Sequence, residues 1–221
     1  AILACNAKPV ISDINKENFF LSISNIKKNI TKKTKAIIPV HIYGQVCNID
    51  EILDVAKDNN LKVIEDCAHA VGTFHKSKHA GTMGSTGCFS FYPTKNITTA
   101  EGGMVITNSK SIAEKVRQLR SHGMTRSLKS RYSSGYPWVF DILEPGYNYR
   151  LDEIRASLGI SQLRRIKKIN ELRKKASTYY NKNLQDIPGI ILPNIVNDRS
   201  HSYHLYTIRV TKDFKLSRKR R

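Results

Sequence analysis

Apolar and polar residues alternate along the chain with two different periods, and this pattern predicts strands and helices in turn. A buried strand is expected at 36–40, an amphipathic helix begins after Asn48, and an apolar strand follows at 61–65. Asn48 and Glu51 have the spacing of a capping box, so their side chains are expected to bond the first turn of that helix. A strand, a helix and a strand in this order form a βαβ unit, which predicts a parallel sheet.

The same pattern predicts a large α/β domain followed by a smaller unit. A long helix begins at Asp152 and is expected to bend at Gly159. We therefore predict an α/β fold with a mixed, mostly parallel sheet at 1–150, and the long helix with part of a small α+β domain at 151–221. The other expected elements are strands at 8–14, 88–91, 104–107, 190–192 and 203–210, helices at 22–30 and 111–121, and an irregular loop at 125–145.

Net charge adds a hypothesis about partners. The chain has 221 residues, and its 37 Lys and Arg against 18 Asp and Glu give a net charge of +19. Such a charge suits a nucleic-acid surface or a phosphate-rich small substrate. The basic residues are spread over several predicted helix faces, however, and no nucleic-acid-binding motif accompanies them. Nucleic-acid binding is therefore kept only as an alternative.

The cysteines and the two ends of the chain bear on its cellular setting. Cys5, Cys47, Cys67 and Cys88 are scattered without paired spacing, which favours a reducing cytosol over a disulfide framework. No apolar run is long enough to predict a membrane span, and no signal sequence opens the chain. We expect a cytoplasmic location. The chain starts inside an apolar run without Met, so we also expect it to be part of a longer protein.

Two residues carry the strongest candidate chemistry. Asp66 follows the strand at 61–65, and in open α/β sheets ligands bind at the carboxyl ends of strands. Lys95 lies in a loop between two short strands. Pyridoxal phosphate chemistry requires such a pair, because a lysine forms a Schiff base with the cofactor aldehyde and a carboxylate keeps the pyridine nitrogen protonated. Each residue alone also fits a capping acid or an exposed lysine, so the interpretation depends on the motifs around them.

Short motifs surround this pair in a fixed order. They are Ala7-Lys8-Pro9-Val10, Pro39-Val40-His41-Ile42-Tyr43-Gly44-Gln45, Ile64-Glu65-Asp66-Cys67-Ala68-His69-Ala70, Phe89-Ser90-Phe91 with Lys95-Asn96, Ala100-Glu101-Gly102-Gly103-Met104, Ser121-His122-Gly123 and Gly146-Tyr147-Asn148-Tyr149-Arg150-Leu151. In this order and spacing they resemble the DegT/StrS-type aminotransferases. These are pyridoxal-phosphate enzymes of fold type I that aminate nucleotide-linked keto-sugars, so the resemblance implies a fold type I large domain.

The resemblance implies a role for individual residues. Lys95 would carry the Schiff base, Asp66 would pair with the pyridine nitrogen, and His69 would lie beside the cofactor ring and its phenolic oxygen. Ser90 would hydrogen-bond the cofactor phosphate. Asn148 would reach the phosphate bound by the neighbouring subunit of a homodimer.

The resemblance also implies substrates and missing parts. Tyr43 and Arg150 would face the substrate, a nucleotide-linked keto-sugar, and glutamate would donate the amino group. An upstream segment that cradles the cofactor phosphate would precede Ala1, and most of the small domain would follow Arg221. A non-catalytic or regulatory protein that keeps the fold is the alternative hypothesis, ahead of nucleic-acid binding.

The remaining histidines do not predict a metal site. His75 and His79 lack a third ligand at a fitting spacing. His201 and His204 flank Tyr203 at the start of a strand-like run, and a structural role is expected for both.

Overall fold

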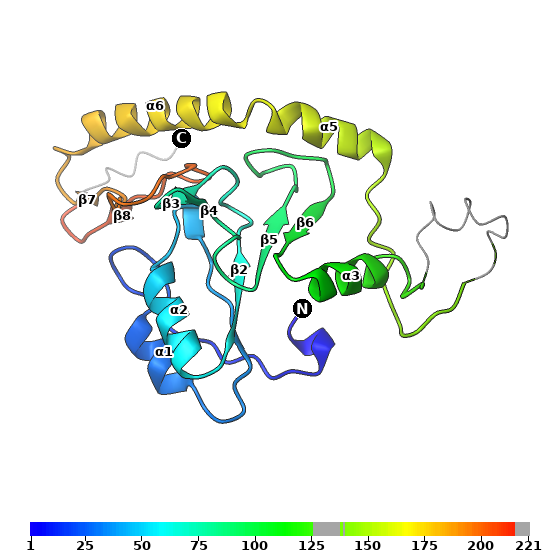
Figure 1. Ribbon diagram of the computed structural model, residues 1–221. Coiled ribbons are helices and arrows are strands. Elements are labelled where there is room, and N and C mark those ends of the chain that lie inside the picture. Colours follow the sequence, from blue (N-terminus) through cyan, green and yellow to red (C-terminus); the bar gives the residue numbers. More distant parts are fainter. Residues whose placement is uncertain (126–137, 139, 215–221) are drawn as a thin grey trace.

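The computed structural model describes residues 1–125, 138 and 140–214, and a four-stranded sheet lies at its centre (Figure 1). The strands lie in the order β1-β2-β5-β6, with β1, β2 and β5 parallel and β6 antiparallel to β5. Their bounds are Ala36–Ile37 for β1, Lys62–Asp66 for β2, Thr86–Ser90 for β5 and Gly103–Ile106 for β6. The predicted α/β fold with a mixed, mostly parallel sheet is confirmed.

Helix α2 (Ile49–Asp58) connects β1 to β2 and completes the predicted βαβ unit. It buries Ile49, Ile52, Val55 and Ala56, which recur at helical spacing and so share one face. Each large aliphatic side chain buried in this way contributes about 1.5–3 kcal/mol to folding. The same core includes Ile26 of α1 (Ile23–Asn29), a short helix that lies beside α2 in Figure 1.

The capping box expected at the start of α2 is wrong. Asn48 is the N-cap residue, but its side chain makes no capping hydrogen bond. Its Oδ1 instead accepts from the Arg199 guanidinium over 3.4 Å, and the same Nη1 donates to the carbonyls of Val46 and Cys47 over 2.8 and 2.9 Å. A charged donor from a distant segment therefore competes successfully with the local cap, and local spacing gives no sign of it.

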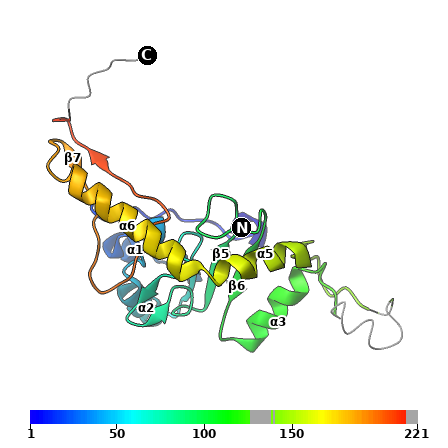
Figure 2. The ribbon, with the colours of Figure 1, turned by 90° about the horizontal axis from the view of Figure 1, so that it is seen from above.

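Helices α5 (Glu153–Leu163) and α6 (Ile166–Leu184) form a long rod across the top of the sheet (Figures 1 and 2). Asp152 caps α5, since its carboxylate accepts from the N–H of Arg155 over 2.9 Å. The predicted bend at Gly159 is wrong, because Gly159 lies inside α5 and the rod breaks after Leu163. The break lets the first turns of α6 pack, through Ile166 and Ile169, against the buried cluster of Val71, Phe91 and Ile97.

The elements around this frame are short. The expected strand at 8–14 is wrong: this segment forms only an isolated bridge, between Ile14 and Leu21, and Ile11 is exposed. An apolar β-branched run becomes a strand only where another strand pairs with it. The other elements are the 3-10 turns Leu3–Cys5 and Ile42–Gly44, the hairpin of β3 (Phe74–His75) and β4 (Lys78–His79), helix α3 (Lys110–Leu119), and the antiparallel pair of β7 (Ile190–Ile191) and β8 (Arg209–Val210).

The strand expected at 203–210 is confirmed only for its last part. Its first residues leave the strand conformation because the N–H groups of Ser202 and His204 donate to the carbonyls of Gly44 and Tyr43. Most of the predicted loop at 125–145 lies outside the described residues, and the domain boundary near residue 150 stays a prediction. None of the helices in the described part of the chain is long and apolar enough to cross a membrane.

Candidate active site

Asp66 lies at the carboxyl end of β2, where the parallel strands of the sheet end. Its N–H donates to the carbonyl of Pro39 over 2.9 Å, and its own carbonyl accepts from the N–H of His41 over 3.0 Å. Oδ1 accepts from the N–H of Ala68 over 3.0 Å, and no described residue donates to Oδ2. The half-buried carboxylate therefore keeps one oxygen for the donor of a ligand.

Lys95 lies on the loop that follows β5, and its side chain is half-buried. Its N–H donates to the carbonyl of Tyr92 over 2.9 Å and closes a turn. The next residue, Asn96, is buried and donates through Nδ2 to the carbonyl of Ser202 over 2.8 Å. The lysine is therefore held between a local turn and a segment more than 100 residues away.

The loop that carries Lys95 returns to the sheet at Gly102, directly before β6, where the backbone packs closely against Thr99. The carbonyl of Gly102 accepts from the N–H of Phe91 over 2.9 Å. A Cβ on Gly102 would lie 2.3 Å from Oγ1 of Thr99, which is itself buried. Any larger residue would push this loop out of place, so the close packing behind Lys95 requires glycine.

His69 connects Asp66 and Lys95. Burial lowers the pKa of His69, the Lys95 ammonium lowers it further, and the Asp66 carboxylate opposes both. Both charges are therefore close enough to act on this ring, and the neutral imidazole is favoured at neutral pH. Three of the residues predicted from the sequence thus lie together at the carboxyl end of the sheet.

Ser90 and Tyr43 border the same group. Ser90 is the last residue of β5, and its Oγ accepts from the N–H of Tyr92 over 3.4 Å. Tyr43 has a left-handed backbone with φ of 59°, and its N–H donates to Nδ1 of His69 over 3.2 Å. The backbone of Tyr43 therefore reaches the site directly, while its ring packs edge-on against Phe19 at 5.8 Å between centroids.

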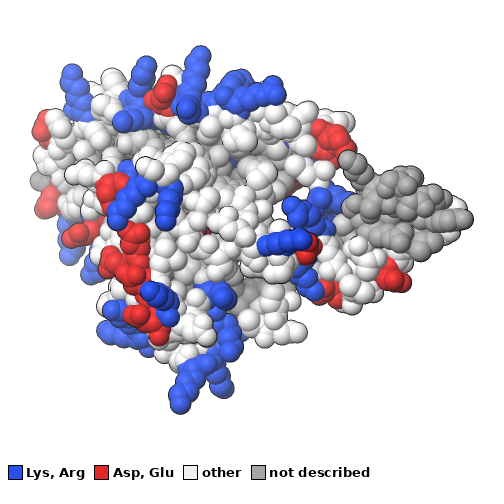
Figure 3. Space-filling view, in the orientation of Figure 1, with Lys and Arg blue, Asp and Glu red and all other residues white. Residues whose placement is uncertain are grey.

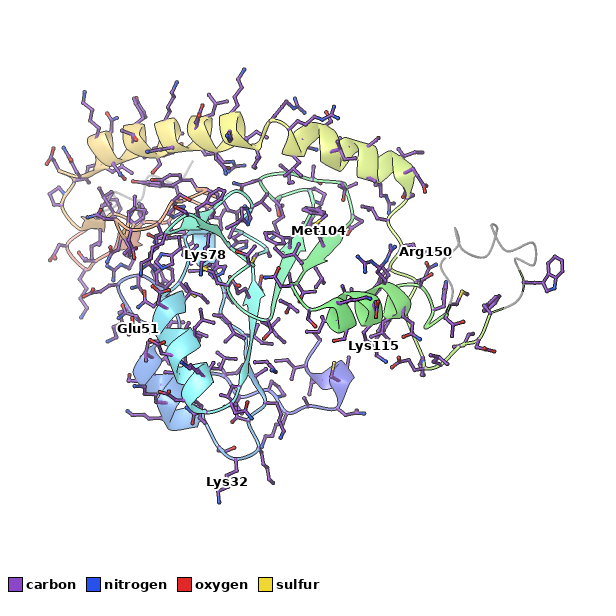
Figure 4. The ribbon with its side chains drawn as sticks, viewed as in Figure 1. Lys32, Glu51, Lys78, Met104, Lys115 and Arg150 are labelled. Atoms are coloured by element: carbon purple, nitrogen blue, oxygen red, sulfur yellow. The ribbon has the colours of Figure 1, made fainter. Side chains whose placement is uncertain are left out.

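Asn148 and Arg150 lie elsewhere, near the end of α3. Asn148 forms a bridge with Ser121, and its Oδ1 accepts from Nε of Arg150 over 3.3 Å. Both are exposed and line a hollow beside α3. Lys115 of α3 lines the same hollow, and Figure 4 shows it close to Arg150. Among the described residues no hydrogen bond or ion pair links them to Asp66, His69 or Lys95.

A buried pair that the sequence did not single out lies directly behind Asp66. Nε2 of His41 donates to Glu65 over 2.8 Å, and both side chains are fully buried. The remaining partners of the Glu65 carboxylate are backbone N–H groups of the turn at 81–84. Burial alone would raise the pKa of Glu65, but the hydrogen bonds from His41, Gly84 and Gly81 outweigh it and keep the pKa below its ordinary value.

The ligand atoms of His41, Glu65 and Cys67 lie within 4.8 Å of one another, which is a spacing that could hold a metal ion. Each is already engaged: Nδ1 of His41 accepts from the N–H of Cys47, and Glu65 is saturated by its donors. Burial, followed by the charge of Glu65, raises the pKa of the Cys67 thiol and disfavours the thiolate that a metal requires. The cluster is therefore a hydrogen-bonded part of the core.

The model of one protein family, described as the DegT/DnrJ/EryC1/StrS aminotransferase family, matches residues 1–220. The chain belongs to this family. The resemblance seen in the sequence is therefore confirmed at the level of the family.

Individual relatives of this aminotransferase-family chain agree. It is 39% identical over 209 residues to a spore coat polysaccharide biosynthesis protein of Bacillus subtilis, covering 95% of this chain and 54% of the relative. It is 37% identical over 219 residues to the GDP-perosamine synthase of Caulobacter vibrioides, covering 99% of this chain and 56% of the relative. The chain therefore spans about half the length of these relatives.

Solved structures show the same fold. A sugar aminotransferase of Streptococcus pneumoniae, described as putative and solved in its PMP-form, superposes with a TM-score of 0.87 at 29% sequence identity. The match covers 96% of this chain and 58% of that one.

The donors and acceptors at the carboxyl end of the sheet fit pyridoxal phosphate in this aminotransferase-family chain. Asp66 offers an unpaired carboxylate oxygen for a cationic ring nitrogen, and Lys95 offers a half-buried amine. Sequence reasoning missed His41 and Glu65 as a pair, and it expected a structural role for His204 without placing it beside His69. Their hydrogen bonds depend on the fold, and the motif spacing gave no signal for either.

Proposed function

We propose that this chain carries the lysine and the acid of a pyridoxal-phosphate-dependent sugar aminotransferase. One observation carries the proposal: Asp66 ends β2, and His204 packs on His69 while bonding Asn96, the residue after Lys95, in a chain of an aminotransferase family. Ligands in open α/β sheets bind at this edge, which is where the three side chains offer an acid, a neutral imidazole and an amine.

Each side chain has a separate task in this proposal. Pyridoxal phosphate, when bound, supplies an aldehyde and a cationic ring that stabilises negative charge on a substrate carbon. Asp66 holds the ring nitrogen protonated through a charge-assisted hydrogen bond. His69 donates to the phenolic oxygen, and the Ser90 hydroxyl binds the phosphate.

Lys95 has two tasks in sequence. Its amine would hold the cofactor through the cofactor's aldehyde, and this attachment needs the uncharged amine. Nζ would also be the base that accepts the proton from the Cα of the donor and the acid that returns it. The turn at Tyr92 and the anchored Asn96 limit how far the lysine can move during this transfer.

We propose an amino acid, glutamate by family resemblance, as the donor, and a nucleotide-linked keto-sugar as the acceptor. The name of the Caulobacter relative, GDP-perosamine synthase, supports a nucleotide sugar, and that of the Bacillus relative supports polysaccharide synthesis. A net charge of +19 suits a diphosphate substrate. Tyr43 and Arg150 are proposed to face this substrate.

Asn148 is proposed to act in a neighbouring subunit. It lies beside α3, and among the described residues no hydrogen bond or ion pair joins it to the Lys95 loop of its own chain, as expected for a residue that completes a site across a homodimer. Its amide would then bind the phosphate next to the partner's Ser90. The chain spans about half the length of its relatives, so this assembly stays a proposal.

Nucleic-acid binding is less well supported. On the face shown in Figure 3, Lys and Arg occur along α6, beside α3 and at the lower tip, with Asp and Glu between them. A sequence-independent nucleic-acid site requires a continuous basic surface that follows the phosphates. A non-catalytic protein with the same fold stays the second candidate, and turnover decides between the two.

The test is covalent capture at Lys95. The purified protein is incubated with pyridoxal phosphate, reduced with borohydride and digested, and peptide mass spectrometry locates the added mass. We expect it on Lys95, and we expect the Lys95→Ala variant to lose both the adduct and the absorbance band of the bound cofactor. Lys110, an exposed lysine of α3, provides the matched control variant Lys110→Ala, which keeps both. Adducts spread over surface lysines would overturn the proposal.

A further inference from the structure

Three segments far apart in the sequence meet at His69. The N–H of Tyr43 donates to Nδ1 of the imidazole over 3.2 Å. The ring of His204 packs on the ring of His69 with 4.2 Å between centroids and 30° between planes. Oγ of Ser202 donates to the carbonyl of His69 over 2.9 Å. His69 is therefore held at one ring nitrogen, on one face of its ring and at its backbone carbonyl.

These contacts assign the position of the proton on His69. A backbone N–H can only donate, so Nδ1 must be the acceptor and the neutral ring carries its hydrogen on Nε2. No described residue accepts from Nε2, and the ring is only half-buried. His69 thus presents one unpaired N–H donor, close to Asp66 and Lys95, whose charges act on the ring.

The ring of His204 has the opposite tautomer to that of His69. Nδ1 of His204 lies 3.2 Å from Oδ1 of Asn96. Nδ2 of Asn96 donates to the carbonyl of Ser202 and to Oδ1 of Asn170 over 2.8 and 3.1 Å, so Oδ1 is the acceptor of that amide. His204 therefore carries its hydrogen on Nδ1. Asn96 directly follows Lys95, and His204 thus joins the face of His69 to the lysine loop.

The backbone of the same segment holds the other partner of His69 in place. The N–H of His204 donates to the carbonyl of Tyr43 over 2.9 Å. Tyr43 has a φ of 59°, a left-handed conformation that costs free energy for a residue with a side chain. Tyr43 donates a hydrogen bond to His69 and accepts one from His204, and both bonds stabilise this turn. The turn conformation directs the N–H of Tyr43 toward Nδ1 of His69.

We propose that His204, tied to Asn96, is a positioning residue that holds His69 as an Nε2–H donor toward an oxygen atom of the ligand bound between Asp66 and Lys95. The identity of that ligand rests on the proposed function, but the proton positions on the two rings do not. Burial, followed by the charges of His69, Lys95 and Arg173, lowers the pKa of His204 to about 4, so a neutral His204 at pH 7 agrees with its hydrogen bond to Asn96.

The test begins with the protein alone. Nitrogen-15 NMR of the imidazoles at pH 7 distinguishes protonated from unprotonated ring nitrogens. We expect the hydrogen on Nε2 of His69 and on Nδ1 of His204. A hydrogen on Nδ1 of His69 would overturn the proposal, whether or not any variant folds.

Variants then test the positioning role. His204→Ala removes the packed ring, and we expect the His69 nitrogens to shift toward a mixture of tautomers and the dissociation constant for pyridoxal phosphate to rise about five- to tenfold, the effect of one hydrogen bond. His204→Phe keeps the ring but loses the bond to Asn96, and an intermediate effect is expected. His201→Phe is the matched control, because His201 belongs to the same segment but packs on Tyr203.

The outcomes separate the two proposals. Unchanged His69 spectra and unchanged affinity in both His204 variants would overturn the positioning role. If His204→Ala does not fold, His204→Phe and the wild-type spectrum decide. The expected tautomers in a protein that fails to bind pyridoxal phosphate would instead contradict the proposed function and leave the positioning of His69 intact.

Discussion

Nε2 of His41 donates to the Glu65 carboxylate over 2.8 Å, and both side chains are fully buried directly behind Asp66. Backbone N–H groups of the turn at 81–84 complete the carboxylate's hydrogen bonds. The N–H of His41 also donates to the carbonyl of Asp66. One buried pair therefore links three segments and holds the strand end that carries the proposed cofactor acid.

Removing the carboxylate of this pair should destabilise the fold strongly. We expect Glu65→Ala to lower the free energy of unfolding by about 3–5 kcal/mol, because the donors of His41 and of the turn at 81–84 lose their acceptor in a dry core. Urea denaturation followed by circular dichroism measures this. Glu171→Ala, at an exposed position of α6, should change the value by less than about 0.5 kcal/mol. Equal effects of the two variants would contradict the role of the buried pair.

Stability should fall as the solution is acidified below pH 6.5. Burial is the largest cause that lowers the pKa of His204 from 6.5 to about 4. The unfolded chain then binds this proton at a higher pH than the folded chain, so acid favours unfolding across that interval, and above it the contribution is fully present.

His201 and His69 also have lowered pKa values and act in the same direction, so the variant His204→Phe is needed to isolate one group. We expect the unfolding free energy of this variant to fall less between pH 7 and pH 4 than that of the wild type. Parallel pH profiles for the two proteins would show that His204 is protonated equally in both states.

The cysteines should differ sharply in reactivity. Cys5 is exposed, whereas Cys47 and Cys67 are buried. Burial, followed by the charge of Glu65, raises the pKa of Cys47 to about 12, and the pKa of Cys67 is raised by the same causes. We expect an aromatic disulfide reagent to react rapidly with Cys5 and more slowly with the half-buried Cys88, whose pKa is raised by burial and by the charge of Asp66, and we expect Cys5→Ser to abolish the fast phase. A fast phase that survives in Cys5→Ser would contradict this order, and a further Cys88→Ser change would show whether it comes from Cys88 or from the buried thiols.

Asp66 should be needed for the reaction more than for the fold. We expect Asp66→Asn to slow the transfer of the amino group from glutamate to the bound cofactor by at least about 100-fold, because a neutral amide cannot hold the ring nitrogen protonated. Single-turnover absorbance spectroscopy follows this step. Asp58→Asn, at the exposed end of α2, is the matched control and should react like the wild type. A rate for Asp66→Asn within a few-fold of the wild type would remove Asp66 from its proposed role.

The local pattern of apolar residues was sufficient to predict the central βαβ unit of β1, α2 and β2. The apolar runs at β1 and β2 and the helical spacing of Ile49, Ile52 and Val55 are short-range signals, and they placed the βαβ unit correctly. The same unit placed Asp66 at the carboxyl end of a strand, and the structure confirms that position, while the role of Asp66 stays a proposal. Pattern failed where a strand lacked a partner, as at 8–14, and where the helical rod breaks after Leu163 instead of at Gly159.

By itself, then, the sequence determined the α/β class and the family and singled out Asp66 and Lys95 as candidates, because periodicity and motif order are properties of neighbouring residues. Only the tertiary structure decided that Glu65 accepts a buried hydrogen bond from His41, that Arg199 bonds the side chain of Asn48, and that His204 packs on His69. These contacts join residues 24 to 151 positions apart, and such hydrogen bonds depend on how distant segments meet in the fold. The spacing of neighbouring residues therefore does not predict these contacts.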